Sequence, residues 1–133
     1  MTIERLTNAD SEPSRMTAEV MKQRTKAYAL RVIRVVQALP RNEVARAVGG
    51  QLLRSGTSVG ANYRAACRAK SRPDFVHKLK IVEEECDESL YWMELLVEGE
   101  VMPAVRLEAL QQEGSEILSI VVASLRTARL RAA

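Results

Sequence analysis

Apolar residues recur every three or four positions along most of the chain, in segments separated by proline or glycine. This spacing places apolar side chains on one face of an α-helix. Only 6 glycines and 4 prolines occur in 133 residues, which leaves few turns for a many-stranded β fold. The pattern therefore predicts an all-α fold, and the length fits one domain.

The first two helical segments are expected over residues 17–38 and 41–70. Leu39-Pro40 separates them, because the residue before a proline avoids the α region. Glycines 49, 50, 56 and 60 lie inside the second segment, where they indicate close contact with another helix. A break or kink near Gly49 and Gly50 is the alternative. The expected inward positions are Met21, Tyr28, Val32, Val35, Leu39, Val44, Val48, Leu52, Ser55, Val59, Tyr63 and Ala66.

The third segment begins at Ser71-Arg72-Pro73-Asp74, since proline suits the first helical turn and an acid suits its dipole. Gly99 ends it, and Pro103 opens the fourth segment. Connections of about two to five residues force neighbouring helices to be antiparallel. We expect an up-down-up-down four-helix bundle over residues 14–133, after a flexible N-terminal tail over residues 1–13. The expected inward positions are Phe75, Leu79, Val82, Cys86, Leu90, Met93, Val97, Leu107, Leu110, Ile117, Val121 and Leu125.

The apolar residues form no run of about 18, so no membrane span is expected. The first residues also lack the hydrophobic run of a secretory signal. On adjacent antiparallel helices, Cys67 and Cys86 would lie too far apart for a disulfide. Two free thiols fit a reducing compartment, and the cytoplasm is the expected location.

Two motifs resemble catalytic or metal sites. Gly56-Thr57-Ser58-Val59-Gly60 matches G-x-S-x-G, with Asp74 and His77 further along the chain. A nucleophile elbow needs a strand before its serine, whereas both flanks here are helical. Asp74 and His77 are also spaced like half of a di-iron site, but such a site needs two histidines and the chain has 1. We expect no enzyme activity, no metal and no cofactor.

The net charge of +3 conceals a strong separation of charge along the chain. Residues 15–72 contain 13 basic and 2 acidic side chains, and residues 83–116 contain 11 acidic and 1 basic. A basic surface of this kind can bind nucleic-acid phosphates. Opposite charges on two sides of a subunit can also dock head to tail into a ring, and a solvated face balanced by neighbouring acids is the third possibility. The candidate nucleic-acid-binding residues are Arg41, Arg46, Arg54, Arg64, Arg68, Lys70 and Arg72, with Lys78 and Lys80 nearby.

A family resemblance rests on three stretches of sequence. Leu39-Pro40-Arg41 followed by QLLRSGTSVGAN at residues 51–62 resembles the core motif of the four helix bundle family. This family is also called the ribosomal RNA intervening-sequence protein family. SRPDFVHKL at residues 71–79 and LYWMELL at residues 90–96 continue the similarity, which spans roughly residues 20–128.

The resemblance implies antiparallel bundles assembled into a homopentameric ring. Members are encoded in intervening sequences of bacterial large-subunit ribosomal RNA genes or as separate genes. The related accessory variability determinant proteins of diversity-generating retroelements bind a reverse transcriptase and nucleic acid. The family's polar positions match Gln51, Arg54, Ser55, Ser58 and Asn62, for which the resemblance implies helix packing and interface hydrogen bonds rather than catalysis.

Two positions depart from the family pattern. Many members have Glu where this chain has Ala65, and an aliphatic residue where it has Glu83. Because Glu83 lies beside the apolar stripe of the third segment, we expect it to face solvent or a basic neighbour.

The function expected from the sequence is that of a non-enzymatic, ring-forming bundle. It would bind RNA or DNA, or a nucleoprotein partner such as a reverse transcriptase, through the basic face of its first two helices. The alternative is a purely structural protein-interaction module whose basic and acidic faces pair between subunits.

Overall fold

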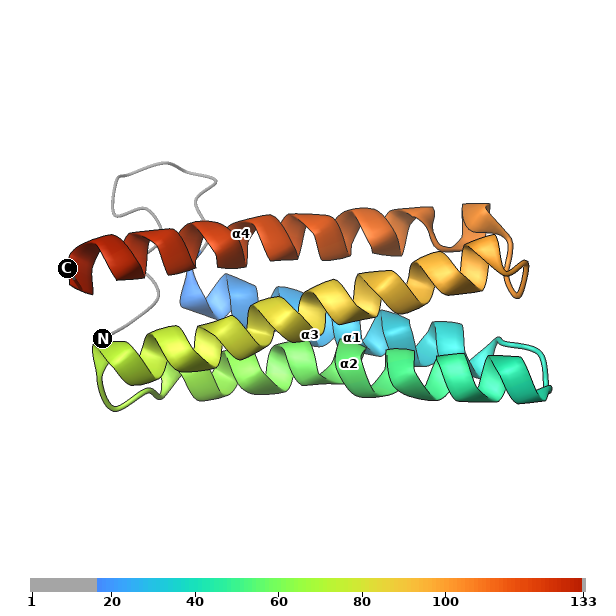
Figure 1. Cartoon of the computed structure of the whole chain (residues 1–133), viewed down its shortest axis with the longest axis horizontal. Helices are drawn as coiled ribbons and strands as arrows, with labels where there is room; N and C mark the ends of the chain where they lie inside the picture. The colour runs from blue at the N-terminus through green and yellow to red at the C-terminus, as the bar shows by residue number, and fades with distance from the viewer. Residues whose placement is uncertain (1–16, 133) are drawn as a thin grey trace.

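The computed structural model describes residues 17–132, and within them the chain forms four long helices and no strand. These are α1 (Ala18–Gln37), α2 (Glu43–Cys67), α3 (Arg72–Glu98) and α4 (Glu108–Ala132). Successive helices run in opposite directions and pack along their length (Figure 1). The predicted all-α four-helix fold is therefore confirmed, and the tail predicted over residues 1–13 lies outside the described residues.

No helix in the described part of the chain has the length and apolar character needed to cross a membrane.

A polar side chain caps each of the first three helices. α1 and α3 begin within one residue of the predicted start, whereas α2 begins at Glu43 rather than at residue 41. Thr17 Oγ1 accepts a hydrogen bond from the Val20 amide at 3.2 Å, and Asn42 Oδ1 accepts one from Ala45 at 2.9 Å. Ser71 Oγ accepts from the Asp74 amide at 3.1 Å. Each cap satisfies a backbone donor that has no partner within its helix.

The connection between α3 and α4 is longer than predicted. Pro103 does not open α4; instead it precedes a short 3₁₀ helix, η2 (Ala104–Arg106), and α4 starts at Glu108. Glu100 adopts a left-handed conformation (φ 58°), which lets the amides of Val101 and Met102 both donate to Leu96 O at 2.9 and 3.1 Å. This turn brings the buried side chain of Met102 against the end of the core.

Most predicted inward positions are buried in the core, which also includes Leu96, Met102 and Ala128, and one predicted position is exposed. Val44 is 58% exposed, whereas the neighbouring Ala45 is 2% exposed. The prediction was wrong there because α2 starts at Glu43, and its inner face passes through Ala45 and Gly49 before reaching Leu52. Five further predicted positions are half-buried at the edge of the core: Val35, Leu39, Val48, Leu90 and Val97.

Three of the α2 glycines allow α1 and α2 to approach closely. A Cβ at Gly56 would lie 2.8 Å from Val32 Cγ2, and one at Gly60 would lie 3.3 Å from the backbone carbonyl of Thr25. A Cβ at Gly49 would lie 2.7 Å from Leu39 Cδ1. The prediction of close helix contact is confirmed at these positions, and α2 continues through residues 49 and 50 as one helix.

A buried hydrogen bond joins α1 and α3 in the middle of the bundle, opposite a glycine of α4. The Tyr28 hydroxyl on α1 lies 2.7 Å from Ser89 Oγ on α3, and Ser89 donates to the Cys86 carbonyl at 2.7 Å. Gly114 on α4 leaves room for this contact, because a Cβ there would lie 2.8 Å from the Tyr28 hydroxyl oxygen. Burial raises the pKa of Tyr28, so the hydroxyl stays protonated.

Candidate nucleic-acid interface

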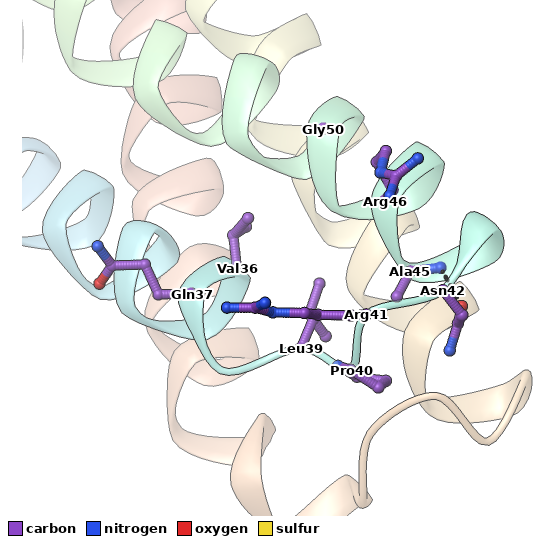
Figure 2. Close-up of a pocket in the computed structure, with 9 residues that line it drawn as sticks. All are labelled: Val36, Gln37, Leu39, Pro40, Arg41, Asn42, Ala45, Arg46 and Gly50. Atoms are coloured by element: carbon purple, nitrogen blue, oxygen red, sulfur yellow. Dashed lines mark hydrogen bonds between the residues drawn. The ribbon is translucent and has the colours of Figure 1, made fainter.

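Arg41 and Arg46 lie at the turn between α1 and α2, beside a surface hollow of about 350 Å³. Asn42 and Ala45, joined by the capping hydrogen bond, form part of its rim. Figure 2 shows the two arginine side chains pointing in different directions, with Arg41 extending toward the last turn of α1. The hollow therefore has no pair of cations converging on one point.

Arg54, in the middle of α2, is held by acidic residues of the same chain. Its guanidinium donates to both carboxylate oxygens of Glu85, at 3.0 and 3.1 Å, and makes a further ion pair with Glu88. Arg24 is held in the same way by Glu113 and Glu116, through hydrogen bonds of 2.6 to 3.1 Å. Some of the charge separated along the sequence is thus neutralised inside one subunit.

Arg64, Arg68, Lys70 and Arg72 lie at the other end of α2 and in the turn to α3. Because Arg64 follows Arg46 by 18 residues of α2, about 27 Å of helix separates this group from Arg46. Arg64 and Arg68 are exposed, whereas Arg72 is half-buried. The seven predicted residues therefore fall into three separate places on the surface.

Arg64 also lines a groove of about 510 Å³ between α1 and α2. Lys22 and Lys26 of α1 form its opposite wall, and the small residues Gly60 and Ala61 lie between the two walls. The backbones of α1 and α2 approach closely at Gly60. Cationic side chains from both helices line the groove on either side of this position.

The end of α4 adds three cations that the sequence-based grouping missed. Arg126, Arg129 and Arg131 are exposed, and α4 ends on the same side of the bundle as the turn between α2 and α3 (Figure 1). Arg126 and Arg129 line a hollow of about 300 Å³ beside Glu83. The up-down topology was the available signal, because it returns the fourth helix to the end where the second finishes.

Glu83 lies as expected beside a basic neighbour. Its carboxylate accepts from Lys80 Nζ at 2.9 Å, and its side chain is 27% exposed. Asp74 is likewise paired with Lys78 at 2.8 Å and accepts from the Lys70 amide at 3.1 Å. The Lys78 ammonium and the Lys70 amide hold the pKa of Asp74 below its ordinary value.

The polar positions of the family motif bond mainly within α2. Ser55 is buried and donates to Gln51 O at 2.9 Å, Ser58 donates to Arg54 O at 2.7 Å, and Asn62 donates to Ser58 O at 2.9 Å. Gln51 is exposed. Ser55 thus contributes to packing without leaving a hydroxyl unsatisfied.

The G-x-S-x-G stretch lies in the middle of α2, with helix on both sides of Ser58. Within residues 17–132, no group of three His, Cys, Asp or Glu side chains is placed to hold a metal ion. Cys67 and Cys86 are free thiols. Burial raises the pKa of both, that of Cys86 to about 12, so both stay protonated near neutral pH.

Comparison with known proteins finds the same fold and a matching sequence family. The model of the family of 23S rRNA-intervening sequence proteins matches residues 18–123. A crystal structure of a protein with unknown function, from the S23 ribosomal protein family of Bacteroides thetaiotaomicron VPI-5482, is 33% identical with a TM-score of 0.78. That alignment covers 84% of this chain and 99% of the other. No curated protein matches the chain.

Proposed function

The chain belongs to the family of 23S rRNA-intervening sequence proteins, and we propose that it is a non-enzymatic, oligomeric bundle that binds RNA. Binding occurs through cations of the first two helices, in the cytoplasm, and requires no metal or cofactor. A nucleoprotein partner such as a reverse transcriptase would bind through the same cations.

The observation that carries this proposal is a set of cations without carboxylate partners. Arg24 and Arg54 show that the chain can pair its arginines internally. Within the described residues, no ion pair is made by Arg41, Arg46, Arg64, Arg68 or Arg72. Uncompensated like charges destabilise a compact fold. The same charges favour binding to a nucleic acid, because they neutralise its phosphates and release the counterions condensed there.

Assembly into a ring is supported by the outer face of α2. Gly50 is exposed, with no atom within 4 Å of the place a Cβ would occupy, and Leu53, three residues further along the same helix, is 37% exposed. An exposed glycine inside a helix costs about 1 kcal/mol relative to alanine, and packing inside this chain does not require it. A second copy packed on this face would use both the glycine and the apolar side chain.

The charges also suit contact between copies. The outward residues of α3 include the exposed side chains of Glu84, Asp87, Tyr91 and Glu94. An acidic face of one copy against the basic first half of the next forms a heterologous contact, which closes into a ring when the rotation permits. Five copies are the number implied by the family resemblance.

The alternative function is that of a purely structural module. The ion pairs of Arg54 with Glu85 and Glu88 favour it, because they show that arginines of α2 can be fully occupied by acidic residues of α3. In this alternative the remaining arginines pair with acids of a neighbouring subunit and bind no RNA.

Binding of a fluorescent RNA to the purified full chain tests the two functions. We expect measurable affinity at about 50 mM salt and a loss of at least tenfold by about 200 mM, because several phosphates release counterions. No binding at the lower salt concentration, or an affinity that does not change with salt, contradicts the RNA-binding function.

Sedimentation equilibrium tests the assembly separately. We expect a mass of five times 14.8 kDa for the native chain. Gly50→Arg should leave the helix content unchanged, since nothing surrounds this position, and should dissociate the assembly. A native chain that remains monomeric rules out the ring, and an unchanged mass for the variant excludes this face of α2.

A further inference from the structure

One end of the bundle gathers arginines from helices that are far apart in the sequence. The end of α2, the start of α3 and the end of α4 lie on the same side in Figure 1. We use the name arginine end for this end of the bundle, whose arginines are Arg64, Arg68, Arg72, Arg126, Arg129 and Arg131. The first three belong to the basic half of the sequence, and the last three do not. Arg64 lies on the side of α1 and α2, whereas Arg126 and Arg129 lie on the side of α3 and α4.

Lysines already neutralise the acidic side chains nearest this end. Glu19 pairs with Lys22 at 3.3 Å, Asp74 with Lys78 at 2.8 Å and Glu83 with Lys80 at 2.9 Å. Within residues 17–132, the arginines of the arginine end make no ion pair. Their charge is therefore available to a ligand, whereas that of Arg54 is not.

Arg72 provides an independent sign of a missing acceptor. Its Nη1 atom is buried from solvent and has no hydrogen-bond partner among the described residues. A buried donor without an acceptor is destabilising, and more so when the group is charged. An anion at the turn between α2 and α3 would supply the acceptor that this nitrogen lacks.

The arginine end has no exposed aromatic ring. Phe75, at the start of α3, and Tyr63, near the end of α2, are buried. Tyr91 and Trp92 lie in the second half of α3, where Trp92 donates to Glu88. Proteins that bind single strands commonly stack bases on exposed aromatic side chains, and the described residues of this end offer no such ring.

We propose that the arginine end binds the phosphate backbone of a double-stranded nucleic acid without reading its bases. The proposal rests on the proposed function and narrows it. The proposed nucleic-acid contact excludes Arg41, Arg46 and Arg54, and it includes arginines of α4. Arginine forks bind phosphate oxygens in pairs, and charges from three helix ends can contact the backbone at separate points.

Matched double variants test where the contact lies. Arg126→Gln/Arg129→Gln removes two exposed charges from the arginine end. Arg34→Gln/Arg106→Gln removes two exposed charges from the opposite end, in the last turn of α1 and in η2. Binding of a duplex RNA of about 20 base pairs is measured by fluorescence anisotropy over a range of salt concentrations. Thermal unfolding confirms that both variants remain folded.

We expect the α4 variant to lose at least tenfold in affinity and to show a salt slope smaller by about 2, one unit for each lost phosphate contact. The control variant should stay within about twofold of the native chain. Equal losses in the two variants, or an α4 variant that binds as well as the native chain, overturn the proposal. A native chain that binds no nucleic acid refutes the proposed function itself, which is a different outcome.

The nature of the ligand is tested with the native chain alone. Two duplexes of unrelated sequence should bind within about threefold of each other, and a DNA duplex within about tenfold, because phosphate contacts do not depend on base or sugar. A single strand of the same length should bind more weakly. Tighter binding of the single strand, or binding of only one duplex sequence, contradicts backbone recognition.

Discussion

At the scale of single residues, two glycines of α2 differ in what an added methyl group would meet. At Gly56 a Cβ would lie within 3 Å of two Val32 methyl carbons, and at Gly50 it would meet no atom within 4 Å. The two positions share a helix, so intrinsic helix propensity is the same for both. The difference in stability between alanine variants at the two positions therefore reports on the packing between α1 and α2.

In the dissociated subunit, Gly50→Ala should raise the free energy of unfolding by about 0.5–1 kcal/mol, because alanine is the better helix former. Gly56→Ala should lower it by about 1–3 kcal/mol, because the core between α1 and α2 is overpacked. Urea unfolding followed by circular dichroism, at one protein concentration, measures both. A change of the same sign in the two variants contradicts the packing described for Gly56.

At the scale of elements, α1 and α4 are joined by a charged clamp. Arg24 donates from Nε and Nη2 to the two carboxylate oxygens of Glu113, at 2.9 and 2.6 Å, and its side chain is only 23% exposed. Glu113 raises the pKa of Arg24 through these bonds. A bidentate pair that is partly shielded from water is stronger than an exposed one.

Arg24→Gln should lower the free energy of unfolding by about 1–3 kcal/mol, because charged hydrogen bonds are lost and Glu113 keeps its charge. Lys22→Gln breaks an exposed pair on the same helix and should cost less than about 0.5 kcal/mol. A double-mutant cycle with Glu113→Gln measures the coupling. If Arg24→Gln costs no more than Lys22→Gln, the clamp does not hold α4.

The helices themselves could be predicted because their signals are local. Ser71 and Pro73 mark the start of α3 within a few residues, and Leu39-Pro40 marks the end of α1. The clamp at Arg24 could not be predicted, since 89 residues separate its partners and only the packing of α4 on α1 brings them together. The turn at Glu100 could not be predicted either, because its left-handed residue is not a glycine, the residue that usually signals such a conformation.

At the scale of the whole molecule, carboxylates compensate part of the positive charge through ion pairs between helices. The chain has 20 lysines and arginines and 17 acids, and ion pairs link acids to basic residues across α1–α4 and α2–α3. The candidate site also belongs to this scale. Arg126 and Arg129 lie outside the basic half of the sequence, and only the return of α4 brings them to the end of the bundle where α2 finishes.

Stability should fall in acid. The pKa of Glu116 is lowered by Gln112 and then by Arg24, and that of Asp74 by Lys78 and the Lys70 amide. A group with a lowered pKa in the folded state stabilises the fold above its unfolded pKa and loses that contribution as the pH falls through the folded value. We expect a constant melting temperature from about pH 6 to 8 and a decline below about pH 4.5.

Asp74→Asn provides the control for this decline. The variant should melt at a lower temperature than the native chain near neutral pH, and the two melting curves should converge below about pH 3. Added salt should reduce the acid destabilisation, because it screens the repulsion between cations that have lost their acidic partners. A native chain as stable at pH 3 as at pH 7 contradicts this account.

The hydroxyl of Tyr28 has a consequence for how the chain finds a single structure. Helices that meet only through aliphatic side chains can slide past one another by a turn at little cost, and the result is an ensemble of near-equal alignments. Here a slide of α1 along α3 would separate Tyr28 from Ser89 and leave a buried hydroxyl without its partner. A slide of α4 would move Gly114 away from the Tyr28 ring, and a larger residue would then collide with that ring. The Tyr28 hydroxyl thus favours one alignment of α1, α3 and α4 over the others that a purely aliphatic core would allow.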